Sequence, residues 1–312
     1  MRVLVTGANG FIGSAVVRKL LHANHEVAAL VRGAQINRLA DVASRIELVH
    51  GDLAAPDADV SHAIGAWRPE GCIHLAWYAE PGKYLEARQN LASLRGSLAL
   101  LDALIECGCR QFVGAGTCAE YADSGEPLRE GDPTSPKTLY AACKLGLCLA
   151  GEQLGRQGLI DFAWGRIFYL YGAGEDSRRM VPALVRALLQ DRLFPATPGE
   201  QVRDYLHIED VAQAFITLLL QRASGIYNIA SAEPVSIAAL MRRIGRSIGK
   251  EHLIQLGAVP YRNWEPPFIS GANDRLHALG WAPAVPFEEG IASVVEHWRA
   301  ALARESAVAR PL

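Results

Sequence analysis

The chain of 312 residues has no excess of positive charge, because its formal net charge at pH 7 is −2. Proteins that bind nucleic acid or anionic lipid surfaces usually present a basic patch, so we expect neither as a partner. No apolar run approaches the roughly eighteen residues that a membrane-spanning helix needs. Where a secretion signal would continue its apolar core, the sequence enters a strand and a glycine-rich turn, so we expect a cytoplasmic protein.

Cysteine is also sparse, and none of the six cysteines belongs to a Cys-x-x-Cys pair. All six lie in apolar or helical segments, which is typical of free thiols that are buried or half-buried. The spacing of Cys107 and Cys109 permits a disulfide or a metal ligand, but no second pair of cysteines or histidines completes a site. We therefore expect no metal centre.

Alternating strand and helix patterns predict an α/β fold, a doubly wound parallel sheet of the Rossmann type with helices on both faces. Short apolar runs predict the strands, at residues 2–6, 26–31, 46–50, 72–75, 111–115, 161–167 and 226–229. Later helical patterns span about residues 181–190 and 288–302. We predict a dinucleotide-binding domain from residues 1–172 plus 207–229 and a smaller mixed α/β substrate-binding lobe from residues 173–206 plus 230–312.

A glycine-rich turn follows the first predicted strand, with glycines at positions 7, 10 and 13. Gly7, Gly10 and Gly13 permit a tight turn, a close approach of the main chain to a diphosphate, and close helix packing. The following helix, which starts near Phe11 and Ile12, would face the phosphates with free amide donors and the positive end of its dipole. The position of the turn between strand and helix favours a nucleotide cofactor.

The second predicted strand ends without an acidic residue. A site that selects NAD usually has Asp or Glu there, to bond the ribose hydroxyls. This chain has Arg32, whose fork of donors suits a 2′-phosphate, and Arg38 is a candidate helper. We therefore favour NADP(H) over NAD(H), with a solvated surface arginine as the alternative interpretation of Arg32.

Further cofactor contacts are expected where other predicted strands end, because ligands of such sheets bind at the carboxyl ends of the strands. Asp52 is placed to accept a hydrogen bond from the adenine amino group, or it only forms a turn. Leu53 follows it directly. Leu75 and Ala76 would form a wall beside the ribose.

Tyr140 and Lys144 are four residues apart, so on a helix both side chains project from one face. An isolated tyrosine has a pKa near 10, and a neighbouring ammonium group, together with an oxidised nicotinamide, favours the phenolate. We therefore predict that Lys144 and the oxidised nicotinamide together bring the pKa of Tyr140 towards the working range. The preceding strand ends near Thr117, which can bring a hydroxyl to the same carbonyl group.

These motifs resemble those of extended short-chain dehydrogenases/reductases of the nucleotide-sugar epimerase/dehydratase class, along nearly the whole chain. The resemblance is carried by the glycine turn, by Thr117 four residues before Tyr121, by the Tyr140/Lys144 pair, and by residues 166–172 and 203–211. It implies that Thr117 holds the substrate oxygen, that Tyr140 is the acid/base, and that Lys144 supports both the tyrosine and the ribose.

The same resemblance implies that Phe168 lines the nicotinamide pocket and that Arg203 binds the diphosphate of a nucleotide sugar. Arginine can contact phosphate oxygens in a bidentate way. The structural alternative for Arg203 is a salt bridge to Asp204 or Glu209.

Several positions depart from the family pattern. The family's 4,6-dehydratases have Asp-Glu directly after the threonine, whereas this chain has Cys118 and Ala119, so we do not expect dehydration. Glu120 either touches the substrate or caps and pairs locally. Tyr169 stands where many relatives have asparagine, which indicates an altered sugar pocket.

Another departure concerns the helix that begins near residue 84. Ser93 aligns best with a structural asparagine of the family, and Asn90 lies nearby, so that either can bond the backbone or a water.

Helices near residues 84–106 and 136–155 carry small and apolar residues, and the resemblance suggests that they pair in a homodimer. These residues include Leu94, Leu98, Leu101, Leu145 and Leu149.

The leading functional hypothesis is an NADPH-dependent reductase of a nucleotide-linked 4-keto-6-deoxyhexose, related to CDP-paratose and CDP-abequose synthases. Arg32 favours it, because net reductases of the family consume NADPH whereas its epimerases usually retain NAD. The alternatives are an NAD-dependent nucleotide-sugar epimerase that works through a transient ketone and, as a minor one, a non-catalytic cofactor-sensing protein.

Overall fold

Seven parallel strands form the largest sheet of the computed structural model, which describes residues 1–55, 58–261 and 265–308. Their order is β10-β6-β5-β4-β1-β2-β3. The strands are β1 (Arg2–Thr6), β2 (Glu26–Val31), β3 (Glu47–His50), β4 (Gly71–His74), β5 (Gln111–Thr117), β6 (Asp161–Ile167) and β10 (Gly225–Ile229). The sheet confirms the predicted doubly wound fold. Its strand order reverses between β1 and β4, where such sheets form a ligand-binding crevice.

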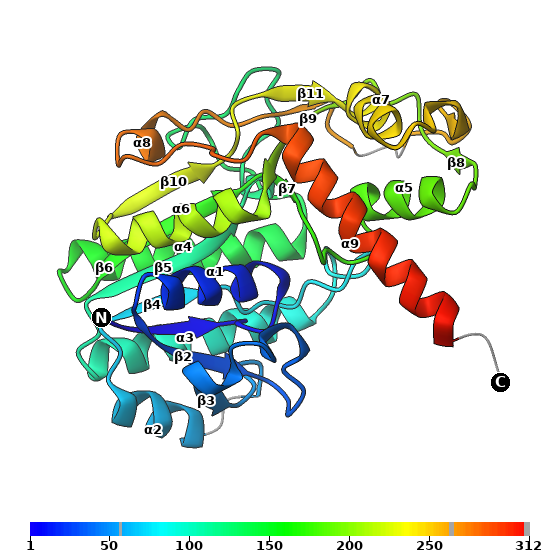
Figure 1. Cartoon of the computed structure of the whole chain (residues 1–312). Coiled ribbons are helices and arrows are strands. Elements are labelled where there is room, and N and C mark those ends of the chain that lie inside the picture. The colour runs from blue at the N-terminus through cyan, green and yellow to red at the C-terminus, as the bar shows by residue number, and fades with distance from the viewer. Residues whose placement is uncertain (56–57, 262–264, 309–312) are drawn as a thin grey trace.

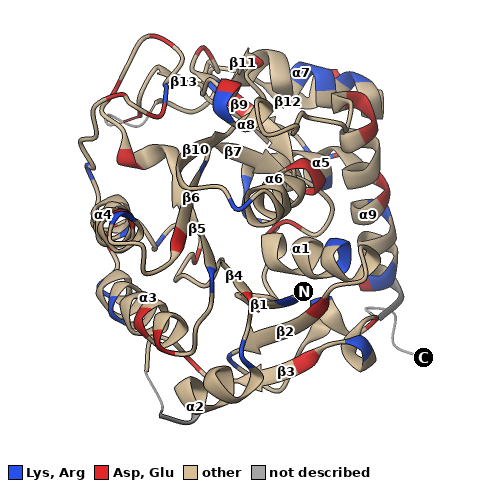
Figure 2. Ribbon diagram, turned by 90° about the vertical axis from the view of Figure 1, so that its left-hand side faces the viewer, with Lys and Arg blue, Asp and Glu red and all other residues tan. Residues whose placement is uncertain are grey.

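Helices cover both faces of this sheet, as Figure 2 shows. The helices α1 (Phe11–His22) and α6 (Ile208–Leu220) lie on one face, where they bury valines, alanines and leucines against the strands. The opposite face is covered by α2 (Ala58–Trp67), α3 (Gln89–Glu106) and α4 (Leu139–Arg156), which enclose a second core rich in aromatic rings. The apolar stripes of these helices explain why the sheet is buried on both sides.

A smaller sheet joins β7 (Tyr169–Tyr171), β9 (Val202–His207), β11 (Pro234–Ser236) and β13 (Phe268–Ile269). In this sheet β9 pairs in parallel with β7 and β13 and antiparallel with β11. Three helices, α5 (Met180–Leu189), α7 (Ile237–Ile248) and α9 (Phe287–Val308), share a core of their own. Figure 1 shows these helices on the side of the molecule towards which β1 points.

Short elements complete the fold, namely β8 (Phe194–Pro195), β12 (Ile254–Gln255) and α8 (Asp274–His277). The division of the chain into two lobes at the predicted bounds stays a prediction. All six cysteines are free thiols, as expected. Among the described residues, we find no helix with the length and apolarity that crossing a bilayer requires.

Some predicted bounds were wrong. The helix α3 begins at Gln89 instead of near residue 84, because the segment before it turns around the Asn90 amide, which donates to the carbonyl oxygens of Tyr84 (2.6 Å) and Ala87 (2.8 Å). The strand β5 runs two residues further than predicted, to Thr117. The helix α9 is also longer than its pattern indicated.

Candidate active site

The turn between β1 and α1 is built for close approach of the backbone. Gly7 adopts φ +64°, and a Cβ atom at this position would lie 2.8 Å from the backbone nitrogen of Ala76. A Cβ atom on Gly13 would lie 2.1 Å from the carbonyl oxygen of Gly7, so only glycine lets α1 pack here. Gly10 begins the helix without a side-chain cap, so the amides of Phe11 and Ile12 are available to an anion.

The tip of β2 carries Arg32, which is exposed directly after the buried Val31. Within residues 1–55, 58–261 and 265–308, no carboxylate forms an ion pair with Arg32. The neighbouring loop is fixed by Asn9, whose side chain bonds the backbone of Gln35 and Arg38 at 3.0 Å each. The Arg38 side chain lines a cavity of about 260 Å³ together with Phe11.

The other predicted cofactor residues lie at the ends of β3 and β4. The Asp52 carboxylate accepts a hydrogen bond from the amide of Ala54 (2.9 Å), so it forms the turn that was one of its two interpretations. Leu53 packs into the core on the α3 side of the sheet. The amides of Leu75 and Ala76 both donate to the hydroxyl of Thr6, at 3.2 Å each, which fixes the backbone against the glycine turn.

Tyr140 lies in the first turn of α4, which begins at the N-cap Thr138. Its ring meets the ring of Tyr84 edge-on at 4.9 Å between centroids, and α4 packs against β5, which ends at Thr117. The structure therefore places Tyr140 on a helix that packs against the strand carrying Thr117, and their predicted catalytic roles stay predictions.

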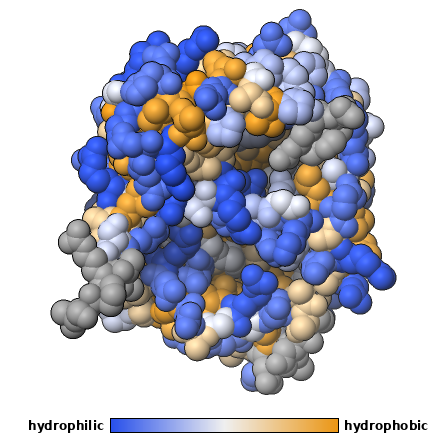
Figure 3. All heavy atoms as spheres, turned by 90° about the vertical axis from the view of Figure 1, so that its right-hand side faces the viewer, coloured by the Kyte–Doolittle hydropathy of each residue, from blue (hydrophilic) through white to orange (hydrophobic). Residues whose placement is uncertain are grey.

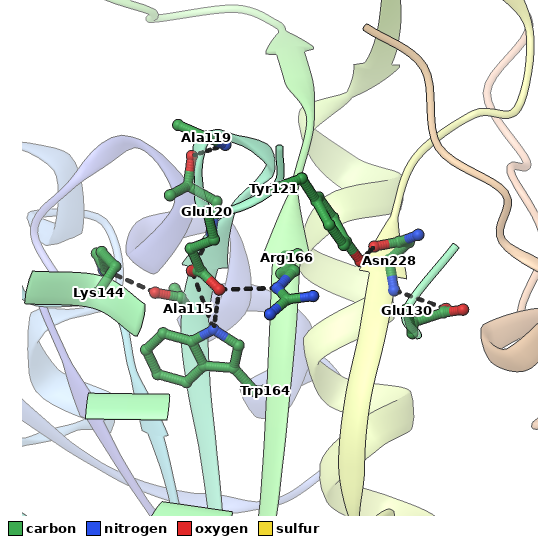
Figure 4. Close-up of polar contacts among 10 residues, drawn as sticks. Ala115, Ala119, Glu120, Tyr121, Glu130, Lys144, Trp164, Arg166 and Asn228 are labelled. Carbon is green, nitrogen blue, oxygen red and sulfur yellow. Dashed lines mark hydrogen bonds and ion pairs between the residues drawn. The ribbon is translucent and has the colours of Figure 1, made fainter. Parts of the chain in front are cut away.

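Burial raises the pKa of Tyr140 well above its ordinary value of 10, although the nearby Thr117 acts in the opposite direction. The predicted lowering of this pKa by Lys144 together with an oxidised nicotinamide stays a prediction. The amine of Lys144 donates to the carbonyl oxygen of Ala115, at 2.6 Å (Figure 4). Lys144 is only 3% exposed, and this burial lowers the pKa of its amine to about 7.

Glu120 is fully buried, and its carboxylate points towards Trp164 and Arg166 (Figure 4). Its carboxylate accepts hydrogen bonds from the amide of Thr117 (2.9 Å), from the guanidinium of Arg166 (2.7 Å) and from the indole of Trp164 (3.1 and 3.2 Å). Of the two roles considered for Glu120, the structure shows the local cap and ion pair. The other role, contact between the Glu120 carboxylate and a substrate, was wrong, because this side chain is fully buried.

The same network continues away from Thr117, as Figure 4 shows. The guanidinium of Arg166 stacks over the ring of Tyr121 at 4.2 Å, and the Tyr121 hydroxyl donates to the side chain of Asn228 (2.7 Å). Asn228, on β10, in turn donates its side-chain amide to the carbonyl oxygens of Leu128 and Ala272. The end of β5 is thus tied across β6 to β10.

Arg203 lies on β9, and its guanidinium sits 5.5 Å from the ring centre of Tyr169. Its ion-pair partner is Glu265, at 3.2 Å, so the two partners considered from the sequence, Asp204 and Glu209, were wrong. The Asp204 carboxylate instead receives hydrogen bonds from the backbone and hydroxyl groups of two loops. The carboxylate of Glu209 pairs with Lys19.

The ring of Phe168 is only 5% exposed and packs in a small core with Tyr121, Leu128 and Ala230. Its predicted place in the nicotinamide pocket stays a prediction. Asn90 and Ser93 both bond the backbone, because the Ser93 hydroxyl accepts from the amide of Tyr78 (3.3 Å) while the Asn90 amide holds the turn before α3.

Sequence reasoning missed Trp77 and Tyr84, which contact the Tyr140 ring, and Arg179, which contacts Tyr84. The indole of Trp77 contacts the Tyr140 ring at 6.5 Å between centroids, and Tyr84 lies on another side of it. The guanidinium of Arg179 lies 5.3 Å from the ring centre of Tyr84. No motif marks these residues, because their contacts arise from loops that only the fold brings together. Figure 3 shows the face of the molecule that lies on the right of Figure 1, with a hollow near its middle.

Residues 3–230 of the chain match the model of the NAD dependent epimerase/dehydratase family. The chain belongs to this family. It is therefore an enzyme of the extended short-chain dehydrogenase/reductase type, as the resemblance in its motifs implied.

Relatives with different reactions align over most of this enzyme. The dTDP-6-deoxy-L-talose 4-dehydrogenase (NAD(+)) of Aggregatibacter actinomycetemcomitans is 25% identical over 284 residues, which cover 87% of this chain and 100% of that protein. The CDP-abequose synthase of Salmonella typhimurium is 26% identical over 310 residues, covering 94% and 97%. The solved structure of the Thermus thermophilus UDP-glucose 4-epimerase with NAD is 28% identical, with a TM-score of 0.84 and coverage of 96% and 100%.

The chain's own residues fit the NAD(P) cofactor of this family. A Cβ atom at Gly7 or Gly13 would collide with the backbone of Ala76 or Gly7, so glycine keeps this turn tight, and α1 presents amides without a side-chain cap. Lys144 and Tyr140 lie on the same helix beside the end of β5. These groups would hold the diphosphate, the ribose and the reacting end of a dinucleotide.

Proposed function

We propose that this enzyme is an NADPH-dependent reductase of a nucleotide-linked 4-keto-6-deoxyhexose. The observation that carries the proposal is the position of Tyr140 in the first turn of α4, which packs against β5 and so lies beside the strand that ends at Thr117. Burial raises the pKa of this tyrosine, which favours its protonated form. A protonated phenol is the form that can give a proton to a carbonyl oxygen, as reduction of a ketone requires.

The roles proposed for these residues are those that the motif of the family implies. Thr117 holds the keto oxygen by a hydrogen bond, and Tyr140 donates its proton to that oxygen. Lys144 keeps its amine beside Tyr140 and bonds the cofactor ribose. The hydride that reaches the keto carbon is the chemistry that a bound NADPH supplies. Arg203 binds the diphosphate of the substrate, and Tyr169 forms a wall of the sugar pocket.

The preference for NADPH is supported by Arg32, an exposed guanidinium at the tip of β2. A permanently charged fork of donors suits a 2′-phosphate, and the strand tip offers no carboxylate to a free ribose hydroxyl. The sugar class is supported by two relatives, because one is named for dTDP-6-deoxy-L-talose and the other for CDP-abequose.

Dehydration is disfavoured by the residues that follow Thr117. Cys118 and Ala119 occupy the positions of the acid and base pair in the family's dehydratases. Burial raises the pKa of the Cys118 thiol to about 12, so this side chain is neutral and is a poor general base near neutral pH.

An NAD-dependent nucleotide-sugar epimerase is the second candidate. The 28% identity to the Thermus UDP-glucose 4-epimerase, which binds NAD, favours it. An epimerase regenerates its cofactor in each cycle, so purified protein would carry tightly bound NAD and would consume no NADPH.

The two candidates are separated by following NADPH absorbance with a panel of CDP-, dTDP- and UDP-linked 4-keto-6-deoxyhexoses. We expect stoichiometric oxidation of NADPH with at least one of them and little with NADH. The matched control is the same panel with the corresponding 4-hydroxy sugars, which cannot accept a hydride. Epimerised product without any change in NADPH would overturn the reductase proposal.

We also propose a homodimer through α3 and α4, supported by leucines that these neighbouring helices expose. Leu98 and Leu149 are exposed, as is Leu91, whereas Leu101 faces the core. A cytoplasmic location stays a prediction.

A further inference from the structure

Trp77 contacts both members of the Tyr140/Lys144 pair. It follows β4 by three residues, and the amine of Lys144 lies 4.1 Å from the centroid of its indole ring. The ring of Tyr140 meets the same indole at an angle of 83°. One aromatic side chain therefore borders the two groups that move the proton in the proposed reaction.

The orientation of this indole is fixed from the far side. Its Nε1 donates to the side-chain oxygen of Asn90 at 2.8 Å, and Asn90 is fully buried. The Asn90 amide is itself held by two backbone carbonyl oxygens. Because every polar atom of the Asn90 side chain is engaged, the amide cannot flip without losing hydrogen bonds, and the indole face is held towards Lys144.

Three titratable groups face the Lys144 amine from the elements around it. Glu120, in the turn after β5, favours the charged amine. His74, on β4, is buried, and its pKa is lowered to about 3, so its ring is neutral. Tyr140, on the same helix, is protonated and carries no charge. Burial therefore opposes the charge on Lys144, and the indole face is a further group that favours it.

We propose that Trp77 is a positioning residue that keeps the amine of Lys144 protonated and aligned beside Tyr140. A cation over an aromatic face is stabilised by the ring quadrupole, most strongly by tryptophan. A contact of this kind corresponds to a shift of about one pH unit in the titration of the amine. This inference rests on the proposed function, because it matters only if Lys144 and Tyr140 act as described.

The test is the titration of Lys144 in the full chain, followed by the 13Cε signal of protein labelled with 13C-lysine. The sequence has five lysines, which are Lys19, Lys83, Lys137, Lys144 and Lys250. The signal that disappears in the variant Lys144→Met is that of Lys144. We expect Trp77→Leu to lower the midpoint of Lys144 by about one pH unit. Trp77→Phe keeps an aromatic face and should restore part of the shift. Trp67→Leu, on α2, is the matched control and should leave the midpoint unchanged.

An unchanged Lys144 midpoint in Trp77→Leu would overturn the inference. Circular dichroism of each variant separates this result from a failure to fold, and Trp77→Phe provides a milder replacement should the leucine variant unfold. The titration needs neither substrate nor cofactor. If no sugar in the panel oxidises NADPH while the midpoint still shifts, the proposed function fails and the role of Trp77 stands. With an active substrate, the alkaline limb of the pH profile of kcat should move to lower pH in Trp77→Leu by the same interval.

Discussion

Replacing Glu120 with glutamine tests the buried network behind Thr117. The wild-type carboxylate accepts from the amide of Thr117, the indole of Trp164 and the guanidinium of Arg166, all of which are donors. A glutamine has one acceptor oxygen, so its amide nitrogen would face a donor. Arg166 would also keep its charge at 2% exposure without an ionic partner.

The expected loss follows from the burial of this pair. Removing one charge of a buried ion pair costs about 3–5 kcal/mol of the free energy of unfolding, because the remaining charge is left uncompensated. A chain of 312 residues has an unfolding entropy of about 0.65 kcal/mol/K, from about 2.1 cal/mol/K per residue. The melting temperature of Glu120→Gln should therefore fall by about 5–8 °C.

Thermal melts followed by circular dichroism measure this change, with the exposed Glu106→Gln as the control of the same chemistry. The double variant Glu120→Gln/Arg166→Met removes both charges and should recover at least half of the lost stability. A melting temperature of Glu120→Gln within about 1 °C of the wild type would refute the reasoning. A double variant no more stable than the single one would refute it as well.

Three further predictions concern the cofactor, pH and assembly. Arg32→Asp should weaken NADPH binding by about 10- to 100-fold, because a charge-assisted contact to the 2′-phosphate is replaced by repulsion. Nicotinamide fluorescence measures the affinity, and an unchanged affinity would reject the role of Arg32 in binding the 2′-phosphate. Burial raises the pKa of Glu175 from 4.5 to about 8, so the wild type should lose stability as pH rises through this range, whereas Glu175→Gln should not. Urea unfolding at pH 5 and pH 8 measures the free energy of unfolding of the wild type and of Glu175→Gln. If the two proteins differ by the same free energy at both pH values, the raised pKa of Glu175 is contradicted. Leu149 is 55% exposed on α4, and the variant Leu149→Glu should be monomeric, because a charge at the interface opposes the homodimer. Light scattering measures the mass of the wild type and the variant, and equal masses would reject this interface.

Much of the fold could be predicted from the sequence, because strand bounds depend on local patterns. The bounds of β1, β2 and β6 agree with the prediction, since each is a short apolar run between polar or turn-forming residues. The start of α3 could not be placed, because the side chain of Asn90 holds the preceding residues in a turn where the residue pattern suggested helix.

The candidate site was predictable only where a motif is contiguous. The pairing of Arg203 with Glu265 joins residues far apart in the chain, and no spacing rule connects them. The environment of Glu120 is supplied by Trp164 and Arg166 from the neighbouring strand. The burial of Tyr140, which raises its pKa in the protein without cofactor, could not be read from the sequence, because it depends on residues that the fold brings around the ring.

The central claim is that the Tyr140 hydroxyl delivers the proton to a ketone held by Thr117. Its most direct test is the rate of NADPH oxidation by Tyr140→Phe with the best 4-keto sugar, beside the Kd for NADPH of the same protein. The variant should lose about 10²- to 10⁴-fold in kcat, because general acid catalysis is removed, and should bind NADPH as the wild type does. A kcat within a few-fold of the wild type would contradict the account.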